Sequence, residues 1–152
     1  STVKVQRKTL YAHALCSIAL GGLITLLFVT QGVLHLSPWY SPQYIVPLAG
    51  MIFASSMNSV SLAAERLYAE MERGVLYQEA KKIALQASLI PVVNSLLAVG
   101  LVSIPGMMTG QILSDVPPLI AARYQIMVMC MVFGAAGISA ACFLVLARSK
   151  KW

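Results

Sequence analysis

Residues 124–147 read YQIMVMCMVFGAAGISAACFLVLA, and this segment establishes the fold class. It contains no Asp, Glu, Lys or Arg, and it is longer than the roughly 20 apolar residues that an α-helix needs to cross a bilayer. Its apolar residues are continuous, whereas those of a membrane β-strand alternate with polar ones. The segment therefore predicts a transmembrane helix.

Three further segments have the same character, at residues 10–33, 44–64 and 83–104. Of the 152 residues, 59% are hydrophobic and 11% are charged, whereas soluble domains average about 45–50% and about 25%. A water-soluble fold of this length could not hide so many apolar side chains. We expect an all-α, polytopic transmembrane bundle of about four spanning helices, with residues 1–152 forming one domain.

The basic residues indicate how the bundle is oriented. The N-terminal arm, the charged segment 65–82 and the C-terminal tail hold ten of the eleven Lys and Arg residues, and Arg123 is the eleventh. The positive-inside rule then places both termini and the 65–82 loop in the cytoplasm. The net charge of +6 does not indicate nucleic-acid binding, because basic and aromatic residues do not interleave as in a binding platform.

No pattern of an enzyme or of a bound cofactor is present. The motifs HExxH, GxSxG and the P-loop are missing from the sequence, so we expect neither catalysis nor ATP hydrolysis by this chain. The cysteines lie in apolar segments without CxxC spacing, which is typical of packing residues. Two weak metal-ligand candidates are the His13–Cys16 pair and the Met107–Met108 pair.

Small residues at helical spacing predict close helix contacts. Ser17, Gly21 and Thr25 recur every four residues in the segment 10–33, a spacing that makes one flat face. A similar set in the segment 124–147 is Gly134, Gly137 and Ala141. We interpret both sets as helix-packing faces.

Uncharged polar residues gather within two of the predicted spans. Ser55, Asn58 and Ser59 share one helical face. The segment 83–104 holds Gln86, Ser88, Asn94 and Ser95. Two interpretations remain open, namely hydrogen bonds between helices and the lining of a polar translocation pathway. Asn58 and Asn94 are the first candidates for a pathway role.

The segment 103–123 cannot form one regular helix. It contains Pro105, Gly106, Gly110, Pro117 and Pro118, and these residues interrupt or terminate helices. We expect a broken or re-entrant segment near residues 103–111, in which Gly106 and Gly110 allow a tight or left-handed path. Such backbone is tolerated in a membrane where it lines a cavity.

The polar groups of this segment would then border the translocation pathway. The candidates are Pro105, Gly106, Thr109, Gly110 and Gln111. A plain extracytoplasmic turn after the segment 83–104 is the alternative interpretation. Both interpretations place the segment at the membrane surface or within it, away from the cytoplasm.

Residues 100–131, GLVSIPGMMTGQILSDVPPLIAARYQIMVMCM, resemble the permease subunits of the FetB-like family of ABC transporters. The family pattern has GLVSLPGMM followed by Thr or Ser and Gly, then DP and YQIMV. Residues 45–56, IVPLAGMIFASS, and residues 89–95, LIPVVNS, also fit the family. The similarity covers essentially the whole chain, which looks like the C-terminal part of a permease or a shortened relative.

The resemblance implies a function and partners. Family members are implicated in iron export, and plant relatives in aluminium tolerance. By resemblance, the chain would be a permease subunit in a bacterial-type inner or plasma membrane, paired as a homodimer and coupled to a separate ATPase that uses ATP. The chain itself would bind no cofactor. Its candidate ATPase-coupling residues are Glu70, Glu72, Arg73 and Gly74.

The sequence also departs from the family pattern. The cytoplasmic loop is shorter than in the family, and the acid of the family's DP turn is here Asp115, followed by Val116 and two prolines. A non-transporting membrane scaffold or assembly protein, derived from a truncated permease, is therefore the alternative. A reading frame that extends upstream through more spanning helices would favour the permease.

Overall fold

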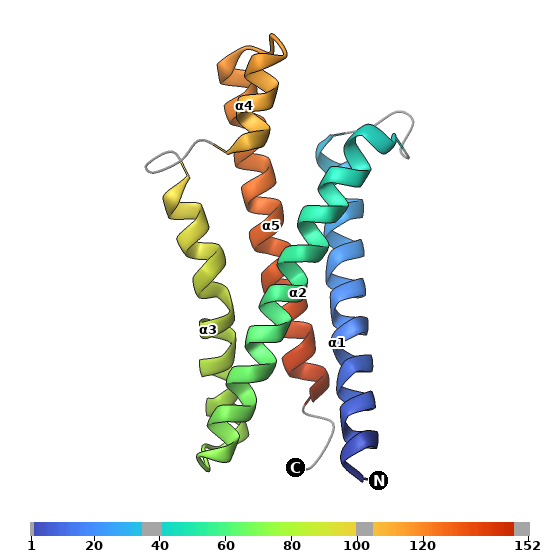
Figure 1. Cartoon of the computed structure of the whole chain (residues 1–152), viewed down its shortest axis with the longest axis vertical. Helices are drawn as coiled ribbons and strands as arrows, with labels where there is room; N and C mark the ends of the chain where they lie inside the picture. The colour runs from blue at the N-terminus through green and yellow to red at the C-terminus, as the bar shows by residue number, and fades with distance from the viewer. Residues whose placement is uncertain (1, 35–40, 100–104, 148–152) are drawn as a thin grey trace.

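The computed structural model describes residues 2–34, 41–99 and 105–147, with the side chains of these ranges except those of residues 2–9 and 43. Within these described ranges, six helical elements follow one another (Figure 1). They are α1 (Thr2–Leu27), the π-helix η1 (Phe28–Val33), α2 (Pro42–Glu72), α3 (Tyr77–Ala98), α4 (Gly106–Leu113) and α5 (Pro118–Leu146). The predicted all-α bundle is confirmed.

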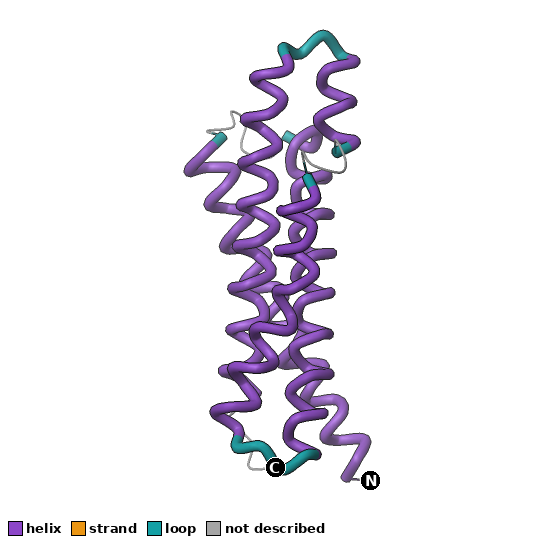
Figure 2. The backbone as a smooth tube through the Cα atoms, turned by 90° about the vertical axis from the view of Figure 1, so that its left-hand side faces the viewer, coloured by secondary structure: helices purple, strands orange, loops and turns teal. Residues whose placement is uncertain are grey.

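The four long helices run side by side along one axis (Figure 2). Helices α2 and α5 pack against each other in the middle, and α1 and α3 flank them on opposite sides (Figure 1). The start of α1, the end of α5 and the α2–α3 turn lie at one end of the bundle, and the α4–α5 turn lies at the other. We call these the terminal end and the hairpin end.

Three helical stretches among the described residues are long and apolar enough to cross a membrane: Leu10–Val33, Tyr44–Glu72 and Pro118–Leu146. The chain is therefore a multi-pass membrane protein. The span predicted at residues 83–104 falls partly outside the described residues, because α3 ends at Ala98 and residues 100–104 are not described. A fourth span stays a prediction.

The predicted loop 65–82 is mostly helical. Helix α2 continues to Glu72 and α3 begins at Tyr77, so the connection shortens to four residues. Gly74, the predicted break, has φ +80°. The N–H of Gly74 donates to the carbonyl of Met71 at 3.0 Å, and the N–H of Val75 donates to the carbonyl of Glu70 at 3.1 Å. This Schellman motif ends α2 sharply and fixes the path of the turn.

Two apolar clusters hold the bundle together. Near the terminal end, α2, α3 and α5 contribute small and large residues that include Val60, Ala84 and Phe143. Nearer the hairpin end, η1, α2 and α5 meet at Val29, Ile52 and Val128. Many of the remaining apolar side chains are exposed on the outside of the bundle, as expected where the surrounding solvent is lipid.

Helix α1 crosses α5 at Gly21. A Cβ atom at Gly21 would lie 2.2 Å from Oγ and 3.0 Å from Cα of Ser139. Ser17 and Thr25 are buried on the same face, so the packing face predicted from their spacing is confirmed. The corresponding prediction is wrong for Gly134 and Gly137, since a Cβ atom at either would meet nothing within 4 Å.

The irregular segment becomes a short helical hairpin. Pro105 precedes α4, and α5 begins directly after Pro117. Of the tight or left-handed path expected at Gly106 and Gly110, the left-handed alternative is wrong, because both lie within α4 and neither has a positive φ. Asp115 takes that conformation instead, at φ +63°. It closes α4 in a second Schellman motif, in which Val116 N–H donates to the carbonyl of Gln111 at 3.0 Å.

Candidate functional site

A polar groove lies between α2, α3 and α5, with a volume of about 340 Å³. Its polar lining consists of three residues of α2 and two of α3: Ser55, Asn58, Ser59, Ser88 and Ser95. Two other hollows, of about 450 Å³ between α1 and α5 and about 320 Å³ between α1 and α2, have almost wholly apolar linings. The difference in chemistry singles out the first groove, which we call the polar groove.

The spacing of the lining residues explains how the polar groove forms. On α2 the lining runs through residues 51, 55, 58, 59 and 62, and on α3 through residues 88, 91, 92 and 95. Steps of three and four keep each set on one helical face. The groove is the space between these two faces, and Val132 of α5 forms part of its wall.

The serines tie the helices together around the polar groove. Ser59 Oγ donates to the carbonyl of Ser88 at 3.3 Å, which links α2 to α3. Ser55 Oγ donates to the carbonyl of Val132 at 3.5 Å, which links α2 to α5. Of the two interpretations left open by the sequence, hydrogen bonding between helices therefore applies to these serines.

Asn58 differs from these serines because it is exposed while lining the groove. It lies within the apolar part of α2, seven residues before Glu65, the first charged residue of that helix, which is about 10 Å at about 1.5 Å per residue. Pro91, on the facing helix, has no N–H to donate to the carbonyl of Ala87. An amide and a main-chain carbonyl thus lie within the apolar part of the bundle, where polar groups need partners or water.

The polar groove does not include all the predicted pathway residues. Asn94 is exposed but does not line the groove, although its neighbour Ser95 does. Gln86 is likewise exposed and outside the lining. Of the two asparagines, the structure brings only Asn58 into the polar groove.

The predicted pathway residues of the segment 105–111 lie at the hairpin end, away from the polar groove. Thr109 Oγ1 donates to the carbonyl of Pro105 at 3.2 Å, within its own helix. Gly106 and Gly110 are exposed, and Gln111 is half-buried. The Oε1 atom of Gln111 is buried and has no hydrogen-bond partner among the described residues.

The weak metal-ligand candidates do not form a cluster in the part of the chain that the structure describes. No group of three or more His, Cys, Asp and Glu residues is close enough to hold a metal ion there. His13 is half-buried and Cys16 is exposed on α1. Met107 packs against the apolar cluster near the hairpin end, and Met108 is half-buried beside it. Packing is the role that the structure shows for Met107.

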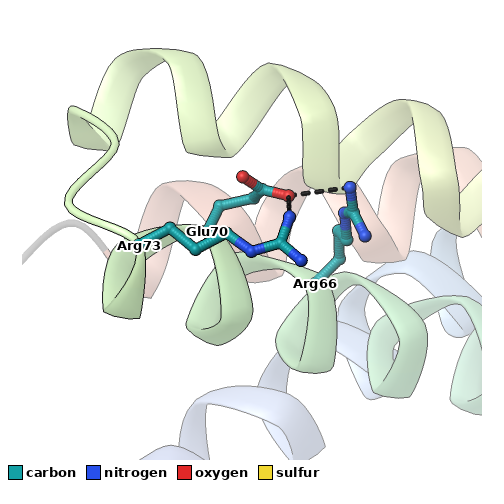
Figure 3. Close-up of polar contacts among 3 residues, drawn as sticks. All are labelled: Arg66, Glu70 and Arg73. Carbon is teal, nitrogen blue, oxygen red and sulfur yellow. Dashed lines mark hydrogen bonds and ion pairs between the residues drawn. The ribbon is translucent and has the colours of Figure 1, made fainter.

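A charged cluster lies at the terminal end of α2 (Figure 3). Glu70 Oε1 forms ion pairs with Nη2 of Arg66 at 2.7 Å and with Nη1 of Arg73 at 3.5 Å. The side chain of Glu70 is only 6% exposed, so of the candidate coupling residues it is the least accessible to a partner. Glu72, Arg73 and Gly74 are exposed. Glu70 therefore stabilises the end of α2, and its neighbours face outward.

Sequence reasoning missed two features near these sites. The π-helix η1 at Phe28–Val33 was not expected, because its segment contains no Pro that would indicate a departure from a regular α-helix. The hydroxyl of Tyr77 donates to the carbonyl of Leu144, which joins the start of α3 to the end of α5. The arginines that neutralise Glu70 could have been found, because residues 66, 70 and 73 have the spacing of helical ion pairs.

Comparisons with known proteins agree with this architecture. The model of the uncharacterised protein family UPF0014 matches residues 1–81 and 75–151. The UPF0014 membrane protein slr1647 of Synechocystis sp. is 37% identical over 145 aligned positions, and the alignment covers 86% of this chain and 56% of the relative. The probable iron export permease protein FetB of Escherichia coli is 34% identical over 151 aligned positions, and the alignment covers 88% of this chain and 57% of the relative.

A plant protein is similar as well. The protein ALUMINUM SENSITIVE 3 of Arabidopsis thaliana is 34% identical over 139 aligned positions, and the alignment covers 81% of this chain and 50% of the relative. The chain spans a little over half of the length of the first two relatives and half of the third. No solved structure matches the chain. The resemblance to FetB-like permeases is confirmed, and the chain belongs to the UPF0014 family of membrane proteins.

Proposed function

We propose that this chain forms part of the transmembrane permease of an ABC transporter that exports a metal, with iron as the first substrate to test. A separate ATPase subunit would bind and hydrolyse ATP, and this chain would bind no cofactor. The polar groove is the observation that carries the proposal. It supports a translocation role because its serine and asparagine side chains lie among the otherwise apolar residues of the bundle.

The chemistry of the polar groove fits a substrate that brings its own ligands. A bare ion in an apolar environment costs tens of kcal/mol. The groove offers the amide of Asn58 and the hydroxyl of Ser95, which can hydrogen-bond the water or organic ligands around a metal ion. The hydroxyls of Ser55, Ser59 and Ser88 already donate to main-chain carbonyls and can only accept. The cation would thus cross hydrated or complexed. The name of the E. coli relative, a probable iron export permease, supports iron.

The arrangement of the ends supports the proposed orientation. The α2–α3 turn lies at the same end of the bundle as the beginning of α1 and the end of α5 (Figure 1), and ten of the eleven Lys and Arg residues belong to these three regions of the sequence. By the positive-inside rule this terminal end would face the cytoplasm. The membrane would be a bacterial-type inner or plasma membrane.

The terminal end would also receive the ATPase. Glu72, Arg73 and Gly74 are exposed there, and exposed charges set the register and orientation of protein partners. The permease would function as a homodimer, because a pathway bordered by three helices of one chain is open on one side. Two copies facing each other would enclose it.

Transport in sealed vesicles tests the proposal. The full chain is reconstituted with its ATPase, and the movement of iron, manganese, zinc and aluminium is measured with ATP and with a non-hydrolysable analogue. We expect iron movement only when both ATP and the ATPase are present. Binding of the ATPase without movement of any of these metals would contradict the proposal and favour the scaffold alternative.

A further inference from the structure

A buried amide lies on α5 between the polar groove and the hairpin end. The side chain of Gln125 is only 9% exposed, and it makes no hydrogen bond within the part of the chain that the structure describes. A buried amide has lost its hydrogen bonds to water, so burial without a partner is costly for the fold. A leucine or methionine would pack there at a lower cost. The packing of α5 therefore does not account for a glutamine at this position.

One helix contact shows where Gln125 lies relative to the polar groove. Ser55 of α2 donates to the carbonyl of Val132 of α5, and both helices run from the hairpin end toward the terminal end (Figure 1). Gln125 precedes Val132, a wall residue of the groove, by seven residues. It thus lies on the same face of α5, about 10 Å nearer the hairpin end. Gln125 lies on the line that leads from the groove to the hairpin end.

The surroundings of Gln125 indicate that this line reaches water. Arg123, the only charged residue of α5, is exposed two residues earlier, which places this level close to the membrane surface. Tyr124 Oη and Gln111 Oε1 are also buried without a hydrogen-bond partner among the described residues. Water or a ligand bound near the hairpin end would supply the partners that these polar groups lack.

We propose that Gln125 contacts the substrate where it leaves the polar groove toward the hairpin end. The inference rests on the proposed function, which supplies the substrate, a metal ion that carries water or organic ligands. The amide has two N–H donors and a carbonyl acceptor, so it can replace the hydrogen bonds that those ligands make with bulk water.

The route is closed beside Gln125 in this structure. Leu48 precedes Ser55 by the same seven residues as Gln125 precedes Val132, so Leu48 and Gln125 lie at about the same level of the bundle. Leu48 is 0% exposed and belongs to the apolar cluster in which α2 and α5 meet. The two helices would part at this level for the substrate to pass, as alternating access requires.

A substitution of similar size separates a role in transport from a role in the fold. Gln125→Met removes the amide and keeps an unbranched side chain. We therefore expect an equal or higher thermal midpoint together with ATP-dependent iron transport at least about tenfold slower. Gln125→Asn keeps the amide and should transport iron faster than Gln125→Met. Gln86→Met is the matched control, because Gln86 is exposed on α3 outside the groove lining, and it should leave transport unchanged.

Iron transport is measured in vesicles that contain the full chain and its ATPase. If Gln125→Met transports iron normally while Asn58→Leu does not, the route avoids Gln125 and the proposed function stands. If the original chain moves no metal with ATP, the proposed function fails, and this inference fails with it. A lower thermal midpoint for Gln125→Met would show that the amide stabilises the fold and would also overturn the inference.

Labelling tests whether this level opens to water during transport. Gln125→Cys is made in a chain whose three native cysteines are replaced by alanine, and a small membrane-impermeant thiol reagent is added on the hairpin side of the vesicles. We expect labelling at least about tenfold faster with ATP than with a non-hydrolysable analogue. Leu144→Cys is the control, because Leu144 is 0% exposed nearer the terminal end, and it should label slowly in both conditions. Slow labelling of Gln125→Cys in both conditions would overturn the proposal.

Discussion

Replacing Gly21 by alanine tests the crossing of α1 and α5. The new methyl group would start 2.2 Å from Ser139 Oγ and 3.0 Å from the Cα and N atoms of the same residue. Ordinary contact begins at 3.4 Å, so the Ser139 hydroxyl must move by about 1.2 Å and the backbone by about 0.4 Å. Overpacking of this kind typically costs about 1–3 kcal/mol.

The helix preference of alanine acts in the opposite direction. Alanine is favoured over glycine within a helix by about 0.5–1 kcal/mol. Gly137→Ala on α5 is the matched control, because a Cβ atom there meets nothing within 4 Å. We expect Gly137→Ala to be neutral or stabilising and Gly21→Ala to be less stable than Gly137→Ala by about 1–3 kcal/mol.

Reversible unfolding in mixed micelles, followed by circular dichroism, measures both variants. The double variant with Ser139→Gly should recover part of the loss, since it removes the nearest obstacle, and the coupling energy should be about 0.5 kcal/mol or more. Equal stability of Gly21→Ala and Gly137→Ala would refute the close crossing. An absence of coupling to Ser139 would show that the two helices meet elsewhere.

Three further substitutions test the ends of the helices, each by the same unfolding measurement. Gly74→Ala should destabilise the protein by about 1–2 kcal/mol, because alanine is strained at positive φ. Gly110→Ala, within α4, should not destabilise it, and equal effects of the two substitutions would contradict the turn geometry. Glu70→Gln should cost about 1–2 kcal/mol through its lost charged hydrogen bonds, and the exposed Glu72→Gln should change stability by less than about 0.5 kcal/mol; the reverse order would contradict the burial of Glu70. Asp115→Gly should stabilise the α4–α5 turn by about 1 kcal/mol by relieving a left-handed residue, and a loss of stability would show that the Asp115 side chain supports the turn.

The helices could be predicted from the sequence because apolar length is a strong signal in a membrane protein. The end of α2 could be predicted only at Gly74, since charged residues 65–72 read equally well as a loop and as a helix that leaves the membrane. The small residues around Gly21 correctly indicated a contact. Those at Gly134 and Gly137 did not, because small size permits close approach without specifying a partner.

The candidate site was predictable at the level of a helix face and less so at the level of residues. Asn58 shares a face with Ser55 and Ser59, and all three line the polar groove. Asn94 is one residue from Ser95, and a rotation of about 100° per residue takes it off the groove-lining face. Which face of α3 meets α2 depends on packing that the sequence alone does not specify.

ATP-dependent iron transport by two asparagine variants is the deciding measurement for the polar groove. Asn58→Leu removes the exposed amide that lines the groove, and Asn94→Leu removes an exposed amide outside it. In vesicles with the ATPase, after both variants are shown to fold, we predict at least about a tenfold loss of transport for Asn58→Leu, equivalent to about 1.4 kcal/mol, and little change for Asn94→Leu. Normal transport by Asn58→Leu, or an equal loss in both variants, would contradict the assignment of the translocation pathway to the polar groove.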